Sequence, residues 1–433
     1  MSRTFRLALL CGTFAPVGAL AQEPTPSPTS HVQVRPEPTP APATVEETGN
    51  LARRSLRSFL RDDESGDGRG IHAGPFLPRV AVLSSGGGPS PVLHLWAPDI
   101  GGTPLDFHAS AAYSIYKYQY YDMQVGLLPH RDKRLPSIET GTNGLFPLSD
   151  IEKTADAPGF NVYASARYRD YPREDFFGVG ANTSNDNHTD YRLRDGLYEG
   201  IVRFRLSHLS VMGRAGLLKT SILPGQDSGD PNTDTLHTEA TAPGLFTGPD
   251  FIHTSIGGWL ELRDEPGNPH KGAAFGLSFA RFNDRNGSAY QFNRASFEGR
   301  EYLPLGSRRS VIALKQTLSF DDPDEGSAVP FYLRSTLGGG SLLRGYASSR
   351  FRDDRLLYLI GEYRFEITPK IEIAAIYEAG KVYRETQDTN LKNLRTGWGA
   401  GIRLKSPRKV HVRLDVVHSD EGNRIHLKLG RSF

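Results

Sequence analysis

The residues of this sequence that could perform chemistry are few and scattered. His253 and Ser255 stand two positions apart, a spacing that puts an imidazole and a hydroxyl on one side of a strand and permits a Ser–His hydrolytic pair. The acidic run 321–325 offers carboxylates that would suit Ca²⁺, although a solvated loop is the simpler interpretation. The 13 histidines include no helical i, i+4 pair beside a carboxylate. We therefore expect no catalytic residue, no metal site and no cofactor.

Charge and hydropathy argue against two large classes of protein. The 433 residues contain 51 Lys and Arg against 49 Asp and Glu, a formal net charge of +2, so the basic surface of a nucleic-acid-binding protein is not expected. Only 37% of the residues are hydrophobic and the mean hydropathy is −0.44. Beyond the N-terminus no apolar run approaches the ~20 residues of a membrane-spanning helix. Aromatic residues (10%) and 46 glycines favour strands and turns.

The N-terminal 75 residues read as export and spacer segments. In residues 1–21, two arginines precede an apolar run that ends in Ala-Leu-Ala, the pattern of a cleaved secretory signal peptide. Cys11 is the only cysteine and lies in this segment, so disulfides and thiol chemistry are not expected in the mature protein. Residues 22–44 are a Pro-rich linker. Residues 45–75 predict a short periplasmic segment, with a possible helix over 45–62.

From residue 76 onwards, apolar and polar residues alternate with a period of two. Along 410–416 the even-numbered positions are apolar, whereas Arg413 and Asp415 share the opposite face. Many such segments run about ten residues, the length of a tilted membrane strand, whereas strands of soluble sandwiches usually stop at five or six. Charged residues at successive inward positions suit a water-filled lumen. We therefore predict an all-β fold, a 16-stranded antiparallel transmembrane β-barrel over residues 76–433.

The expected strands are even in number, as bacterial single-chain barrels require. With both termini in the periplasm, the long segments 171–194, 223–251 and 321–353 fall on the outer side. The connection 129–156 disagrees, because it should be a short periplasmic turn; either this turn is enlarged or the strand count is locally wrong. The expected strands cover residues 76–84, 90–98, 105–115, 117–128, 157–170, 195–208, 209–222, 252–264, 271–284, 287–301, 309–320, 354–367, 369–383, 395–406, 408–418 and 423–433.

One segment is more specific than the alternation. Residues 337–346 read Leu-Gly-Gly-Gly-Ser-Leu-Leu-Arg-Gly-Tyr, and Arg350-Phe351-Arg352-Asp353 follows. This resembles the Arg-Gly-Tyr/Phe loop of the BamA/TamA-like outer-membrane superfamily, the bacterial surface antigen barrels. Residues 262–272 resemble the Asp-rich turn of that family, and residues 376–380 its aromatic-x-Asp-x-Gly strand, with Glu378 in place of Asp. The final strand resembles the C-terminal insertion signal of outer-membrane barrels through Leu427, Leu429, Gly430 and Phe433.

The resemblance implies that the loop folds back into the lumen and binds its wall. Arg344 can donate a forked, charge-assisted pair of hydrogen bonds to a carboxylate. Gly345 would permit a close approach or a positive φ, and Tyr346 would stack on the wall. The family's acidic partner maps to Glu378, and Glu362 and Asp415 are inward-facing alternatives. We expect the lumen to be lined by Arg167, Arg203, Arg205, Glu362, Glu378, Arg413 and Asp415.

The resemblance also implies a function. Members of the superfamily open a weakly paired seam between the first and last strands, here near 78–84 and 423–433. We expect an assembly, translocation or lipid-handling factor of the bacterial outer membrane. Only residues 22–75 precede the expected barrel, too few for a POTRA domain with its own core, which would make this a POTRA-less member. The alternative is a passive or loop-plugged pore or a structural surface protein, and an outer-membrane hydrolase is the weakest hypothesis.

The expected partners follow from the location. They are outer-membrane lipid and lipopolysaccharide, the barrel assembly machinery for the protein's own insertion, and unfolded outer-membrane proteins or lipids as cargo. No nucleic acid is expected among them.

Overall fold

The computed structural model describes residues 76–84, 86–129, 148–154, 159–227, 229–287, 289–406 and 409–429. The expected signal peptide, the Pro-rich linker and the helix over 45–62 lie outside the described residues and stay predictions. Within the described ranges no helix is long and apolar enough to cross a membrane.

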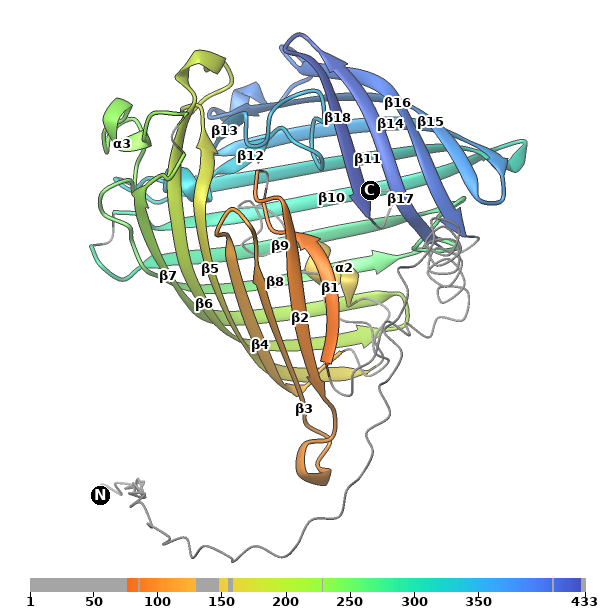
Figure 1. The fold of residues 1–433 in the computed structure, drawn as a ribbon, viewed down its shortest axis with the longest axis horizontal. Helices are drawn as coiled ribbons and strands as arrows, with labels where there is room; N and C mark the ends of the chain where they lie inside the picture. Colours follow the sequence, from red (N-terminus) through yellow and green to blue (C-terminus); the bar gives the residue numbers. More distant parts are fainter. Residues whose placement is uncertain are drawn as a thin grey trace, which may run out of the picture. The chain divides into compact units, whose positions relative to one another are not determined.

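Sixteen antiparallel strands follow one another around a single sheet, which begins at β1 and ends at β18 (Figure 1). The strands of the sheet are β1 (Phe76–Val82), β2 (Pro89–Ala97), β3 (Asp106–Tyr113), β4 (Gln119–Leu127), β5 (Phe160–Phe176), β6 (Thr189–Leu206), β7 (Leu209–Pro224), β8 (Phe251–Glu261), β9 (Gly272–Asp284), β10 (Phe292–Leu305), β11 (Ser307–Pro323), β14 (Arg355–Thr368), β15 (Ile371–Tyr383), β16 (Arg395–Ser406), β17 (Lys409–Ser419) and β18 (Gly422–Leu429).

The sheet confirms the predicted fold class and the order of all sixteen strands. Two of the expected outer segments are shorter than predicted. The ladder of β5 and β6 continues past a bulge between Tyr171 and Glu174, so only residues 177–188 connect these strands instead of 171–194. The segment after β11 contains its own small ladder of β12 (Ser335–Leu337) and β13 (Phe351–Asp353). The added residues of β5 and β6 are buried or half-buried on both faces, and because such strands do not alternate, the sequence pattern did not indicate these extensions.

The enlarged connection between β4 and β5 is real. Because β4 pairs with β5 and the strand order is unbroken, the strand count was not locally wrong. This connection contains the short helix α2 (Leu148–Lys153). Helix α2 contacts β7, β8, β9 and β10 rather than projecting away from the sheet.

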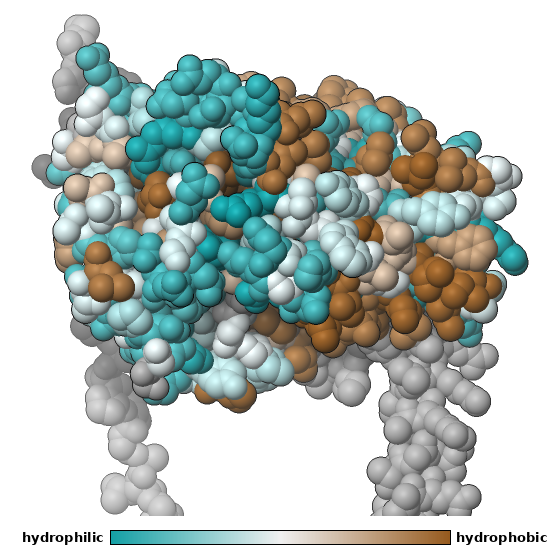
Figure 2. All heavy atoms as spheres, turned by 90° about the horizontal axis from the view of Figure 1, so that it is seen from above, coloured by the Kyte–Doolittle hydropathy of each residue, from teal (hydrophilic) through white to brown (hydrophobic). Residues whose placement is uncertain are grey.

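The two faces of the sheet differ as the alternation predicts. In β6, Tyr198, Val202 and Phe204 are exposed on the outer face, whereas Arg203 on the inner face is fully buried. Figure 2 shows hydrophobic side chains gathered toward one end of the face in view and hydrophilic side chains toward the other. An outward apolar band beside a polar end is what a membrane-spanning barrel presents to lipid and water.

The end of the lumen at the β5–β6 connection is filled by an aromatic core. Phe331, in the connection between β11 and β12, is fully buried, and its ring centroid lies 4.8 Å from that of Phe176 and 4.9 Å from that of Tyr191. The connection between β7 and β8, which contains α3 (Thr233–Leu236), adds Ala242 and Leu245 to the same cluster. The connections at this end of the sheet thus pack together into one hydrophobic core.

Candidate functional site: the buried loop arginine

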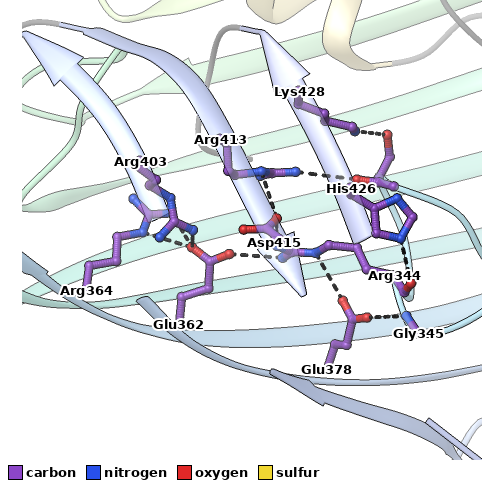
Figure 3. A network of polar contacts seen from close by, with 12 residues as sticks. Arg344, Gly345, Glu362, Arg364, Glu378, Arg403, Arg413, Asp415, His426 and Lys428 are labelled. Carbon is purple, nitrogen blue, oxygen red and sulfur yellow. Dashed lines mark hydrogen bonds and ion pairs between the residues drawn. The ribbon is translucent and has the colours of Figure 1, made fainter. Parts of the chain in front are cut away.

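Arg344 lies in the connection between β12 and β13, and the structure surrounds it with three wall carboxylates (Figure 3). Its Nη2 lies 2.9 Å from Glu362 Oε1 on β14, and its Nη1 lies 2.6 Å from Asp415 Oδ2 on β17. Its Nε lies 3.4 Å from Glu378 Oε2 on β15. Arg344 is 2% exposed, so all three contacts are shielded from bulk water. The sequence offered Glu378 with two alternatives, and the geometry brings all three together.

Further arginines of the wall complete a charge network. Glu362 Oε2 accepts from Arg364 Nε at 2.9 Å and from Arg403 Nη2 at 2.6 Å. Arg413 Nε lies 2.9 Å from Asp415 Oδ2. Arg403 Nε also lies 3.8 Å from Glu372 Oε1, so four guanidiniums and four carboxylates form one buried network. Removing one member of such a buried network leaves an uncompensated charge, which is strongly destabilising.

Small residues make room for these long side chains. A Cβ at Gly401 of β16 would lie 2.2 Å from Asp415 Oδ1. A Cβ at Gly345 would lie 2.7 Å from Ser419 Cβ, so this glycine serves a close approach of the loop to β17. The backbone N–H of Gly345 donates to Glu378 Oε1 at 3.2 Å. Of the two roles considered for Gly345, the structure thus supports the close approach.

The loop also binds the last strand of the sheet. His426 Nε2 on β18 donates to the carbonyl oxygen of Arg344 at 2.7 Å, and Lys428 Nζ donates to Ser341 Oγ at 2.6 Å. Ser419 Oγ at the end of β17 donates to Gly345 O at 2.7 Å. Tyr346 is buried with its ring 5.2 Å from that of Phe351, and its hydroxyl donates to Thr396 O of β16. The loop therefore joins β18, an edge of the sheet, to the inner wall.

A second pair of arginines holds the loop at the outer end. Arg352 is 1% exposed, lies over the rings of Phe176, Tyr191 and Phe331, and donates through Nη1 to Phe331 O at 2.9 Å. Arg350 donates to Glu421 Oε1 at 2.7 Å and to Thr183. Desolvated cation–π contacts of this kind strengthen the attachment of the loop beyond the Arg344 network.

The other predicted residues have different surroundings. Leu427 is exposed on the outer face of β18, whereas the Leu429 side chain, Gly430 and Phe433 lie outside the described residues. His253 is buried on the inner face with Nε2 3.7 Å from Glu199 Oε1.

The prediction that 321–325 is a solvated loop is wrong for Asp321, which lies in β11, is 1% exposed and pairs with Arg294 at 2.5 Å. The ladder of β11 extends further outward than the sequence indicated, because its outer end is covered by the inserted loops.

Sequence reasoning missed Arg364, Arg403, His426 and Lys428 as contacts of the site. Their positions on the inward face follow from the alternation, but their convergence on one loop requires the curvature of the sheet. The alternation thus identifies candidates, and only the tertiary structure selects among them.

His188, in the outer connection between β5 and β6, offers a pH-dependent contact. Its Nε2 lies 3.1 Å from Asp175 Oδ1 and its Nδ1 lies 3.1 Å from Asp230 Oδ1. The hydrogen bond with Asp175 raises the pKa of His188 above 6.5, although partial burial opposes this, and the charges of both aspartates add to the increase. A raised pKa in the folded state stabilises the contact at pH values below about 6.5 and loses this stabilisation as the pH rises through the folded value.

We expect proteolysis of the outer connection around Asp230 to accelerate between pH 6 and pH 8. The His188→Asn variant should cleave rapidly at both pH values, because it cannot carry the charge. Equal pH dependence in the variant and the parent would show that another group is responsible.

Comparisons with known proteins support the fold. Residues 250–433 match the Omp85 superfamily domain. Among solved structures, BamA from Haemophilus ducreyi lacking POTRA domains 1–3 is 12% identical, with a TM-score of 0.56 over 82% of this chain and 69% of that chain. No protein of curated function matches the sequence significantly.

Two weaker likenesses are to CdiB proteins. CdiB from Acinetobacter baumannii gives a TM-score of 0.43 at 12% identity, over 79% of this chain and 56% of that chain. CdiB from Escherichia coli gives 0.45 at 12% identity, over 83% and 63%. This chain therefore spans less than two thirds of either CdiB chain.

The fold and the site together define a 16-stranded membrane barrel whose arginine-bearing loop is bound to its inner wall. Residues 250–433 match the Omp85 superfamily domain, and the fold of the chain is similar to that of BamA.

Proposed function

We propose that this protein is an outer-membrane assembly, translocation or lipid-handling factor that works through a lateral seam between β1 and β18. The observation that carries the proposal is the attachment of the Arg344 loop to β18 through His426 and Lys428. Because the Arg344 loop lies in the lumen and is bound to an edge strand, a change in the position of the loop would be transmitted to that strand. Unpaired edges are templates for a new strand, which is the property that strand-by-strand insertion of a barrel requires.

The proposed seam joins the first and last strands in the order of the sheet, β1 and β18. The substrates that pass through the seam would be unfolded outer-membrane proteins or lipids. Lipopolysaccharide would surround the barrel in the membrane.

A disulfide staple across the seam tests the proposal. Cysteine pairs that join Val80 or Val82 of β1 to Ile425 of β18 are tested to find the pair that forms a disulfide. We expect that staple to abolish complementation of a depletion strain and to lower the amounts of other outer-membrane barrels, with recovery on reduction. The matched control joins Val416 to Ile425, which already oppose each other in the β17–β18 ladder. Unchanged growth and envelope composition with the seam stapled would contradict the proposal.

A loop-plugged barrel with a structural role is the second candidate. The aromatic core around Phe331 favours it, because the outer end of the lumen is packed with side chains. This candidate predicts full function of the stapled protein, so the same experiment separates the two. A passive open pore is disfavoured by that core.

A further inference from the structure

Helix α2 lies against the inner wall of the barrel, although it belongs to a periplasmic connection between strands. It contacts β8 and, to a lesser extent, β7, β9 and β10, which are distant from it in the sequence. Figure 1 shows α2 behind β1, within the curve of the sheet. Leu148 and Ile151 are buried in a cluster with Trp259 and Met212 of the wall. The helix therefore occupies part of the lumen.

The contact depends first on Glu152, which is 5% exposed. Arg300 of β10 donates a fork to its carboxylate, with Nη1 2.8 Å from Oε1 and Nη2 2.9 Å from Oε2. Arg263, just beyond β8, donates through Nη2 to Oε1 at 2.9 Å. A second helix carboxylate, Asp150, pairs with Arg214 of β7 at 3.0 Å. Two-pronged guanidinium recognition is selective for carboxylate and phosphate oxygens.

Among the described residues, the group of wall charges around Glu152 has one cation more than it has carboxylates. Arg263 pairs with Glu261 at 2.5 Å, and Glu298 pairs with Arg300 at 2.5 Å and with Lys315 at 3.2 Å. These five wall groups are three cations and two carboxylates. Glu152 supplies the missing negative charge. A buried cluster with an unmatched cation would be costly, so the site has a preference for an anion whether or not the helix provides it.

The shape of the wall also fits the helix. A Cβ at Gly257 of β8 would lie 2.7 Å from Ile151 Cδ1, so a larger residue there would force Ile151 to shift. The indole of Trp259 covers Gly276 of β9, where a Cβ would lie 2.6 Å from the ring. Arg300 lies over the same indole at 5.3 Å. The charge of the wall, the shape of the wall and the burial of the contact residues thus each favour the binding of α2.

We propose that Arg263 and Arg300 form an oxyanion-binding site in the lumen, and that α2 plugs this site with its own Glu152. An entering substrate that bears a carboxylate or a phosphate would take the place of Glu152 and release the helix. The plug acts on the β7–β10 side of the barrel, separate from the Arg344 loop on the β14–β18 side. It does not depend on the lateral seam.

The first experiment measures access to the helix. Ile151→Cys is introduced with Cys11, the only native cysteine, replaced by serine, and a hydrophilic maleimide is added to the folded protein. We expect labelling to be at least tenfold faster when Glu152→Lys is added, because the helix is then repelled by Arg263 and Arg300. Asp388→Lys, the same charge change at an exposed residue, should leave the rate unchanged. Equal rates with and without Glu152→Lys would overturn the proposal.

A second pair of variants tests the plug without altering charge. Gly257→Val should displace Ile151 and speed labelling, whereas Gly258→Val, whose Cβ meets nothing closer than 3.7 Å, should not. Heat-modifiable electrophoretic migration verifies that each barrel is folded. Equal labelling of two folded variants would also overturn the plug.

The third experiment tests the oxyanion site by chemical rescue. In Glu152→Ala, acetate or inorganic phosphate should raise the unfolding midpoint, whereas chloride at equal ionic strength should not. The additional change Arg300→Gln should abolish this effect. A stronger effect of acetate would indicate a polypeptide carboxylate, and a stronger effect of phosphate would indicate a lipid headgroup. Equal midpoints in all three salts would overturn the site.

Discussion

Arg344→Ala is expected to destabilise the barrel by about 3–5 kcal/mol, the range measured when one partner of a buried ion pair is removed. The variant leaves Glu362, Glu378 and Asp415 without their shared cation, and each of them is at most 1% exposed. The loop also loses the contacts that hold it against β15 and β17. The free energy of unfolding in denaturant, measured in lipid vesicles, gives the magnitude.

The same variant should change conductance. The parent should give low, flickering single-channel currents, because the loop fills the lumen. Arg344→Ala should give a sharp rise, limited by α2 and by the aromatic core around Phe331. Arg308→Ala is the matched control, since Arg308 has a 76% exposed side chain and pairs only at the surface with Asp264. A large, steady parent current that the variant leaves unchanged would show that the loop does not close the lumen.

Arg344→Lys separates charge from geometry. Lysine keeps the positive charge, but its three N–H donors share one nitrogen and cannot reproduce the planar spread of the three guanidinium nitrogens that face the three carboxylates. We expect it to recover part of the lost stability and little of the loop position. Full recovery would mean that the network needs only a cation at this point.

Glu362→Gln is expected to have the larger effect on folding. Glu362 is the single carboxylate that contacts Arg344, Arg364 and Arg403, at 2.9, 2.8 and 2.6 Å. An amide of the same size cannot neutralise three buried guanidiniums, so their mutual electrostatic repulsion is no longer compensated. We expect a loss of at least about 3–5 kcal/mol, or failure to insert as a heat-modifiable barrel.

A compensating change distinguishes repulsion from lost packing. Adding Arg403→Leu to Glu362→Gln removes one of the guanidiniums that have lost their carboxylate partner. This change should recover part of the stability, because apolar replacements of buried ion networks are often tolerated. The double variant and both single variants form a thermodynamic cycle. Strict additivity of the two changes would contradict the repulsion argument.

The Arg344 loop and helix α2 are bound to different strands of the barrel wall. Arg344 and its loop bind β14, β15, β17 and β18, on the side where the sheet ends. Helix α2 binds β7, β8, β9 and β10, near the middle of the sheet. A substrate that releases only one of them would open part of the lumen. Combining Glu152→Lys with Arg344→Ala should therefore raise conductance further than either change.

The sequence by itself determined the strand order and the inward and outward faces. Alternation with a period of two is a local property, so the inward positions of Arg203, Glu362, Arg413 and Asp415 follow from their neighbours in the chain. The loop motif around Arg344 is also a local pattern, and it indicated the superfamily.

The tertiary structure alone decided which inward charges meet. Glu362, Glu378 and Asp415 converge on Arg344 because three strands curve around one loop, and no local pattern encodes that curvature. Likewise, the place of α2 depends on Gly257 and Arg300, which lie more than a hundred residues from Glu152 in the sequence. Contacts between distant segments are set by register and sheet curvature, which the sequence of any one strand leaves open.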